Sequence, residues 1–108
     1  MTDPSSSRLE TFRAMVAKNP SNALARFGLA NEAAKLSLHA EAVEHYDAYL
    51  AMYDDEGNGW QRMAESLIRL DRIAEGRDAL RKGIGASNRF GHTGMAAELE
   101  DLLEEIGG

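Results

Sequence analysis

The sequence predicts an all-α fold of about six helices. Three observations predict it. The chain of 108 residues has only two prolines, residues that favour helices (Ala, Leu, Glu and Arg) dominate it, and apolar residues recur at spacings of three and four. The composition, 44% hydrophobic and 28% charged, is typical of one compact soluble domain that buries its own core.

A period of 34 residues runs along the chain. The residues that keep this step are Phe12, Tyr46 and Leu80; Val16, Leu50 and Ile84; and Glu10, Glu44 and Asp78. Large residues therefore match large ones, and acidic residues match acidic ones. Because a pair of antiparallel helices cannot bury both of its faces alone, this regularity predicts repeated helix pairs that stack on one another.

The first helix is predicted near 7–18. Ser7 followed by Glu10 has the spacing of a capping box, and the turn at 19–22 contains Asn and Pro residues that end a helix. Residues 1–6 precede the cap, and we expect them to be flexible.

Five further helices are predicted from the same apolar spacings. They lie near 23–36, 40–53, 60–70, 73–84 and 92–106. Glycine and polar residues at Gly83, Gly85, Ser87 and Asn88 are expected to loosen the chain after the fifth helix. Gly107 is suited to the left-handed conformation just past the end of the last helix.

The stretch from Asp54 to Glu65 has two interpretations. Its acidic, amide and glycine residues fall at positions 1, 3, 5, 6 and 12 of a calcium-binding EF-hand loop. Against calcium, the register of 34 makes Trp60 already helical, and Gln61 stands where an aliphatic residue is usual. We therefore favour a turn between two helices, with calcium binding by a helix-loop-helix at 54–65 as a weaker alternative.

The remaining composition argues against several functions. A net charge of −6 opposes nucleic-acid binding, which needs clustered Lys and Arg. The absence of cysteine excludes thiol chemistry, and the three histidines lack the close spacing of zinc ligands. No nucleophile, phosphate loop or isolated carboxylate pair is recognisable, so we expect no catalytic residue, no metal and no cofactor.

The first residues and the lengths of the apolar runs indicate where in the cell the protein lies. The first residues lack the pattern of a signal peptide, and no run is long enough to span a bilayer. We therefore expect a cytoplasmic protein without a membrane partner.

Two short motifs and a proline add to the period of 34. The motif W-x2-M-A-x2-L begins at Trp60, A-x3-Y begins at Ala42, and a proline stands at Pro20. With these residues the chain resembles the tetratricopeptide repeat family, and short stand-alone bacterial proteins of that family in particular: the motifs resemble the first and second helices of a repeat, and Pro20 takes the closing proline position. The resemblance implies a right-handed α-α superhelix in a single domain, 7–106. Its parts are a half-repeat at 7–22, repeats at 23–56 and 57–90, and a capping helix at 92–106.

In this family the first helix of each repeat lines a concave groove that holds a peptide or a partner helix. The resemblance implies groove positions at Phe27, Asn31, Lys35, Gln61, Arg62, Glu65 and Arg69. Asn31 matches an asparagine of the carboxylate clamp used by co-chaperones, but Phe27 replaces the clamp lysine and Arg62 replaces its second asparagine. Lys35, Arg62 and Arg69 can still meet an acidic segment.

The sequence therefore predicts a non-catalytic adaptor that binds a protein or peptide segment, with an acidic segment as one candidate. The alternative is a self-associating structural subunit in which the first or last helix docks on a second copy. We expect a monomer or a weak homodimer.

Overall fold

The computed structural model describes residues 4–107, and this part of the chain contains six α-helices and no strand. The helices are α1 (Pro4–Lys18), α2 (Ala23–Lys35), α3 (His39–Met52), α4 (Asn58–Arg69), α5 (Ile73–Arg89) and α6 (Thr93–Glu105). The prediction of an all-α fold is confirmed. The chain divides between Tyr53 and Asp54 into two compact units, which we call the N-terminal and C-terminal units.

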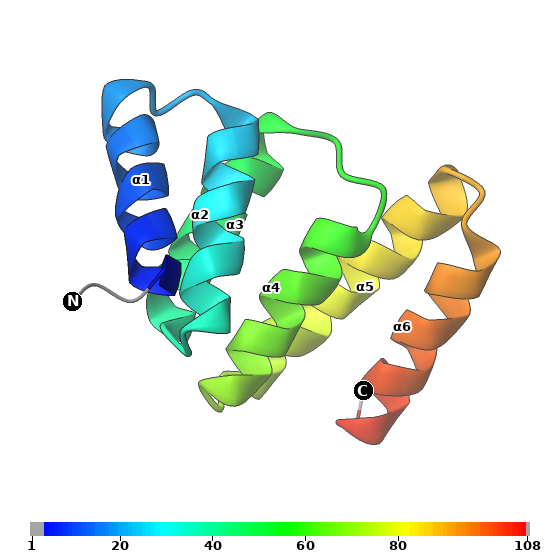
Figure 1. Ribbon diagram of the computed structural model, residues 1–108. Helices are drawn as coiled ribbons and strands as arrows, with labels where there is room; N and C mark the ends of the chain where they lie inside the picture. The colour runs from blue at the N-terminus through cyan, green and yellow to red at the C-terminus, as the bar shows by residue number, and fades with distance from the viewer. Residues whose placement is uncertain (1–3, 108) are drawn as a thin grey trace. The chain divides into compact units, whose positions relative to one another are not determined.

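In the N-terminal unit, α2 packs against both α1 and α3 (Figure 1). Leu29 of α2 and Tyr46 of α3 are almost completely buried. Alanines on the facing sides of α2 and α3 leave no accessible surface and allow the two helices to approach closely. On the side of α2 that faces α1, Gly28 allows the ring of Phe12 to pack closely, because a Cβ built at Gly28 would lie 2.4 Å from that ring.

In the C-terminal unit, α5 packs against both α4 and α6 (Figure 1). Leu67, Leu80 and Leu99, one from each helix, form the buried centre of this unit. The period of 34 thus places Tyr46 and Leu80 at the centres of the two units, as core residues.

The period of 34 also appears in the backbone of two turns. Ser37 follows α2 and Asp71 follows α4, and both take a left-handed conformation, with φ of 63° and 60°. After Ser37, the amide of Leu38 donates to the carbonyl five residues earlier at 2.8 Å. After Asp71, the amide of Arg72 does the same at 2.9 Å. These are Schellman turns, and they reverse the chain in the same way at both places.

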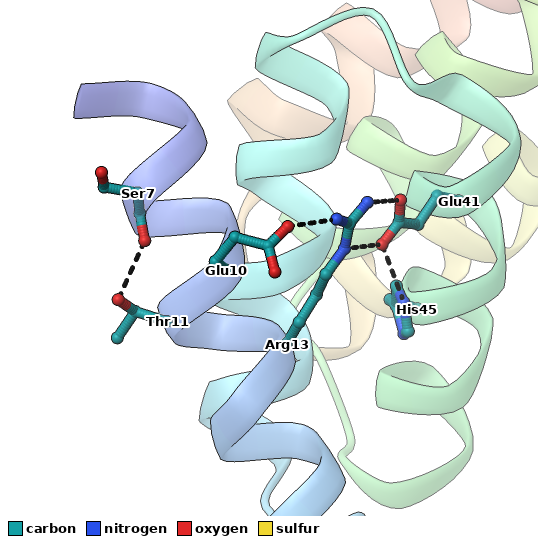
Figure 2. Close-up of polar contacts among 6 residues, drawn as sticks. All are labelled: Ser7, Glu10, Thr11, Arg13, Glu41 and His45. Carbon is teal, nitrogen blue, oxygen red and sulfur yellow. Dashed lines mark hydrogen bonds and ion pairs between the residues drawn. The ribbon is translucent and has the colours of Figure 1, made fainter. Parts of the chain in front are cut away.

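The first helix begins earlier than predicted. α1 starts at Pro4, so the prediction of a capping box at Ser7 is wrong. Ser7 lies inside the helix, where its carbonyl accepts a hydrogen bond from the Thr11 hydroxyl at 2.9 Å (Figure 2). Proline fits a first helical position because its missing N–H has no helical partner to lose. Of the segment 1–6 that we expected to be flexible, residues 1–3 lie outside the described part.

The fifth helix ends later than predicted. α5 runs without interruption to Arg89, so the expected loosening at 83–88 is wrong. A Cβ at Gly83 would lie 2.9 Å from the Cβ of Trp60 in α4, and Ser87 is buried and donates from its hydroxyl to the Gly83 carbonyl at 2.8 Å. Close packing of α4 on α5 therefore outweighs the low helix propensity of glycine.

Candidate partner-binding surface

The exposed side of α2 carries the groove residues predicted for the N-terminal unit. Phe27 and Asn31 are half-buried and Lys35 is exposed, because at 100° per residue they point away from buried Leu29. Leu24 lies on the same side, three residues before Phe27, and is 81% exposed. Leu24 is not among the residues predicted from the sequence, although the helical period places it in the stripe.

An aromatic row lies beside this stripe. The ring of Phe27 is 4.6 Å from that of Tyr49 and 6.0 Å from that of Tyr46, between centroids. Tyr49 stacks in turn on Tyr53 at 5.5 Å, and Tyr53 is 54% exposed. Phe27 is therefore partly a packing residue, and the accessible apolar surface of this region is shared with Leu24 and Tyr53.

Polar contacts orient the rest of the α2 face. The hydroxyl of Tyr46 donates to Oδ1 of Asn31 at 2.6 Å, which fixes the direction of the amide. Lys35 Nζ lies 4.0 Å from Glu32 Oε1, and an exposed pair at that distance contributes little stability. Lys35 thus places an exposed positive charge at the end of the stripe.

The exposed side of α4 carries the four remaining predicted residues. Arg62, Glu65 and Arg69 are exposed and Gln61 is half-buried. Arg62 Nε donates a hydrogen bond to Asn58 Oδ1 at 3.4 Å, one turn away. The charge sign alternates along the helix, so the α4 face is polar where the α2 face is largely apolar.

The structure thus assigns three predicted residues to one face of α2 and four to one face of α4. The two helices belong to different units, and a common concave groove stays a prediction.

The loop before α4 is organised by Asp55. Its side chain is buried, and Oδ1 accepts hydrogen bonds from the amides of Gly57 and Gly59, both at 2.8 Å. Asp55 therefore satisfies backbone donors at the start of α4, as an acidic capping residue does. Sequence reasoning missed it, although aspartate followed by closely spaced glycines is typical of such a turn.

The other carboxylates of this loop contact basic side chains. Asp54 Oδ1 lies 2.6 Å from Arg89 Nη2, and Glu56 Oε1 lies 3.3 Å from His92 Nε2. Because α4 begins at Asn58, helix occupies most of what would be the EF-hand loop. Within residues 4–107, no group of three or more His, Asp or Glu side chains is placed to hold a metal ion. The segment between Met52 and Asn58 connects α3 to α4, as the interpretation of a turn between two helices predicts.

A second polar cluster joins α1 to α3. The guanidinium of Arg13 donates to both carboxylate oxygens of Glu41, at 2.9 and 2.6 Å, and to Glu10 at 2.6 Å (Figure 2). These hydrogen bonds hold the pKa of Glu41 below its usual value. His45 lies 3.7 Å from the same carboxylate. A paired and hydrogen-bonded cluster of this kind positions two helices and leaves no isolated acid or base for catalysis.

Comparison with known proteins supports the fold. No protein-family model matches the chain, and no curated protein matches its sequence. Among solved structures, the chain is similar to the "Crystal structure of MamA", with a TM-score of 0.70 and 12% identity, over 99% of this chain and 76% of that one. The fold is a TPR-like (tetratricopeptide-like) helical fold. None of the described helices is both long and apolar enough to cross a membrane.

Proposed function

We propose that the protein is a non-catalytic interaction module of the tetratricopeptide type, an adaptor that holds a peptide or helix of a partner protein along the exposed faces of α2 and α4. The TPR-like fold supports this assignment, as do the Schellman turns that recur after 34 residues. Stacked helix pairs expose one helix of each pair along a continuous face, and such faces serve extended binding.

One observation carries the proposal: Leu24 is 81% exposed on the same side of α2 as the predicted contact residues. Burying a leucine side chain on binding contributes about 1.5–3 kcal/mol, and anchors of this kind dominate interface energies. Phe27 and Tyr53 extend the apolar surface next to it, so an apolar side chain of the partner is expected here.

The α4 face supplies charge. Arg62 and Arg69 flank Glu65, and arginine pairs with carboxylates through two parallel hydrogen bonds. Lys35 places a positive group at the end of the α2 stripe. Each face therefore favours acidic residues in a partner segment, and the α2 face also favours an apolar anchor.

Affinity capture from the source cell, followed by quantification of the captured proteins, tests the proposal. Leu24→Ala and Arg62→Glu are each expected to lower capture of a specific protein by about tenfold, as loss of a contact worth about 1.4 kcal/mol would. Phe27→Ala is a weaker probe, because Phe27 also packs against Tyr46 and Tyr49.

Matched controls lie off these faces. Leu38→Ala changes a 41% exposed leucine between α2 and α3, and Arg81→Glu changes an exposed arginine of α5. Both are expected to capture as the parent does. Equal capture by parent, Leu24→Ala and Arg62→Glu would show that these faces are not used.

We further propose a cytoplasmic protein that is a monomer or a weak homodimer and catalyses no reaction. Light scattering over a wide concentration range tests the oligomeric state. A stable assembly at low concentration would favour the self-associating subunit instead.

A further inference from the structure

The first two residues of α4 form the one Asn-Gly sequence of the chain, Asn58-Gly59. Asn-Gly is chemically reactive because glycine has no Cβ to hinder its nitrogen from approaching the asparagine side chain. Asn58 is exposed to water. Sequence and exposure alone therefore mark Asn58 as prone to deamidation.

The backbone geometry opposes that reaction. The nitrogen that would attack is the amide of Gly59, and its N–H donates to Asp55 Oδ1 at 2.8 Å. Deprotonation of this amide next to a buried carboxylate is disfavoured, because it would place two negative charges in contact. The helical hydrogen bond from Gln61 N to the Gly57 carbonyl, at 3.0 Å, also holds Asn58 in helical geometry.

We propose that Asn58 is a latent modification site, and that the hydrogen bond from Gly59 to Asp55 controls its deamidation. When this hydrogen bond opens, the Gly59 nitrogen attacks Cγ of Asn58. The new N–Cγ bond replaces the bond from Cγ to Nδ2, and the side-chain NH2 group leaves as ammonia, with the proton of the Gly59 amide as its third hydrogen. Water then opens the succinimide to aspartate or isoaspartate, with no change of oxidation state.

The product differs from the parent in charge and in backbone length. Aspartate at this position adds a carboxylate within reach of Arg62, whose Nε is already 3.4 Å from Asn58 Oδ1. Isoaspartate adds one main-chain carbon to the first turn of α4, and this shift is incompatible with two amides converging on Asp55. Deamidation therefore changes the polar face of α4 and loosens the start of the helix.

Peptide mapping by mass spectrometry after incubation at mildly alkaline pH tests the proposal on the whole chain. Conversion at Asn58 is expected to be slow in the folded protein and much faster in the same protein unfolded in urea. Asp55→Ala is expected to accelerate conversion in buffer by about 5- to 30-fold, the effect of a lost helix cap on the opening equilibrium. Asp54→Ala, which removes the neighbouring carboxylate that contacts Arg89, is expected to convert at the parent rate.

Two further measurements keep the test decisive if Asp55→Ala folds poorly. Asp55→Asn keeps an oxygen that can accept from Gly59 but loses the negative charge, so its conversion should be faster than in the parent and slower than in Asp55→Ala. Hydrogen exchange of the Gly59 amide in the parent should be slow, since opening of the same hydrogen bond limits both processes. Equal rates of conversion in folded and unfolded parent protein would overturn the proposal, as would equal rates in Asp55→Ala and Asp54→Ala.

Discussion

Arg77 of α5 donates a hydrogen bond from Nη2 to the main-chain carbonyl of Ile106 at 3.1 Å. Ile106 is the C-cap of α6, and α6 has no basic residue in its own last turn. The guanidinium of a neighbouring helix therefore supplies the positive charge that favours a helix C-terminus and satisfies one of its open carbonyls.

Replacement of Arg77 should destabilise the C-terminal unit at this point. Arg77→Ala is expected to lower the free energy of unfolding by about 1.5–3 kcal/mol, the range for a hydrogen bond to a charged group. Urea unfolding measures it. Arg81→Ala is the control, because Arg81 lies on the same helix, is exposed and pairs with Asp78 at 3.3 Å, so a change of at most about 1 kcal/mol is expected. Equal losses in the two variants would contradict a capping role for Arg77.

Two glycines of the C-terminal unit should respond to alanine with opposite signs. Gly57 has a φ of 131°, and a Cβ there would lie 2.2 Å from Ser87 Oγ, so Gly57→Ala is expected to cost about 2 kcal/mol or more. Gly85 is helical, and nothing lies within 4 Å of a Cβ built on it. Gly85→Ala is expected to stabilise by about 0.5–1 kcal/mol. Thermal unfolding measures both, and the same sign in both variants would contradict the geometry.

The Schellman turns supply a matched pair of sites in the two units. Ser37 and Asp71 hold left-handed conformations, with φ of 63° and 60°, that cost a residue with a Cβ about 1–2 kcal/mol. Glycine removes this cost but gains freedom in the unfolded chain, so Ser37→Gly and Asp71→Gly are each expected to stabilise by about 0.5–1 kcal/mol. A loss of stability in either variant, measured by urea unfolding, would mean that its side chain has a role that the turn geometry does not explain.

The sequence was a good guide where the period of 34 applies. α2, α3 and α4 begin and end within two residues of their predicted bounds, because each helix repeats the apolar spacing of another. The predicted end of α5 was wrong because Gly83 and Ser87 have low intrinsic helix propensity. Only the structure shows that Gly83 packs against Trp60 and that Ser87 is buried, with its hydroxyl bonded to the Gly83 carbonyl.

The candidate site was predicted less completely than the fold. The resemblance supplied residues at fixed positions, but it could not show that Phe27 packs against Tyr49. Nor could it show that Leu24 is the most exposed of the large apolar side chains whose burial the structure describes. Asp55 was missed because the spacing of an EF-hand begins at Asp54, and the hydrogen bonds of a single turn are decided by backbone direction, which composition does not reveal.

His45 adds a pH-dependent element to the N-terminal unit. Arg26 Nη1 lies 3.0 Å from His45 Nδ1. A guanidinium can only donate, so Nδ1 accepts, and neutral His45 carries its proton on Nε2, toward Glu41. Protonation of Nδ1 would abolish the hydrogen bond from Arg26 and place two positive charges in contact.

Stability should therefore fall as the pH falls. Burial, reinforced by the charge of Arg26, holds the pKa of His45 below its usual 6.5 in the folded protein. The unfolded chain then binds more protons once the pH falls below 6.5, so the contribution of His45 is complete above that value and is lost as the pH falls through the folded pKa. Hydrogen bonds from Arg13 likewise lower the pKa of Glu41 below 4.5, which places a second loss at more acidic pH.

Urea unfolding across this range separates the two groups. In His45→Gln, the glutamine oxygen can still accept from Arg26, but no proton is bound. The decrease between neutral pH and the range of Glu41 should therefore be smaller in this variant than in the parent, while the acidic decrease remains. His39→Gln, at a histidine of the first turn of α3, is the control and should follow the parent more closely than His45→Gln does. Parallel curves for the parent and His45→Gln would show that His45 titrates alike in the folded and unfolded chain.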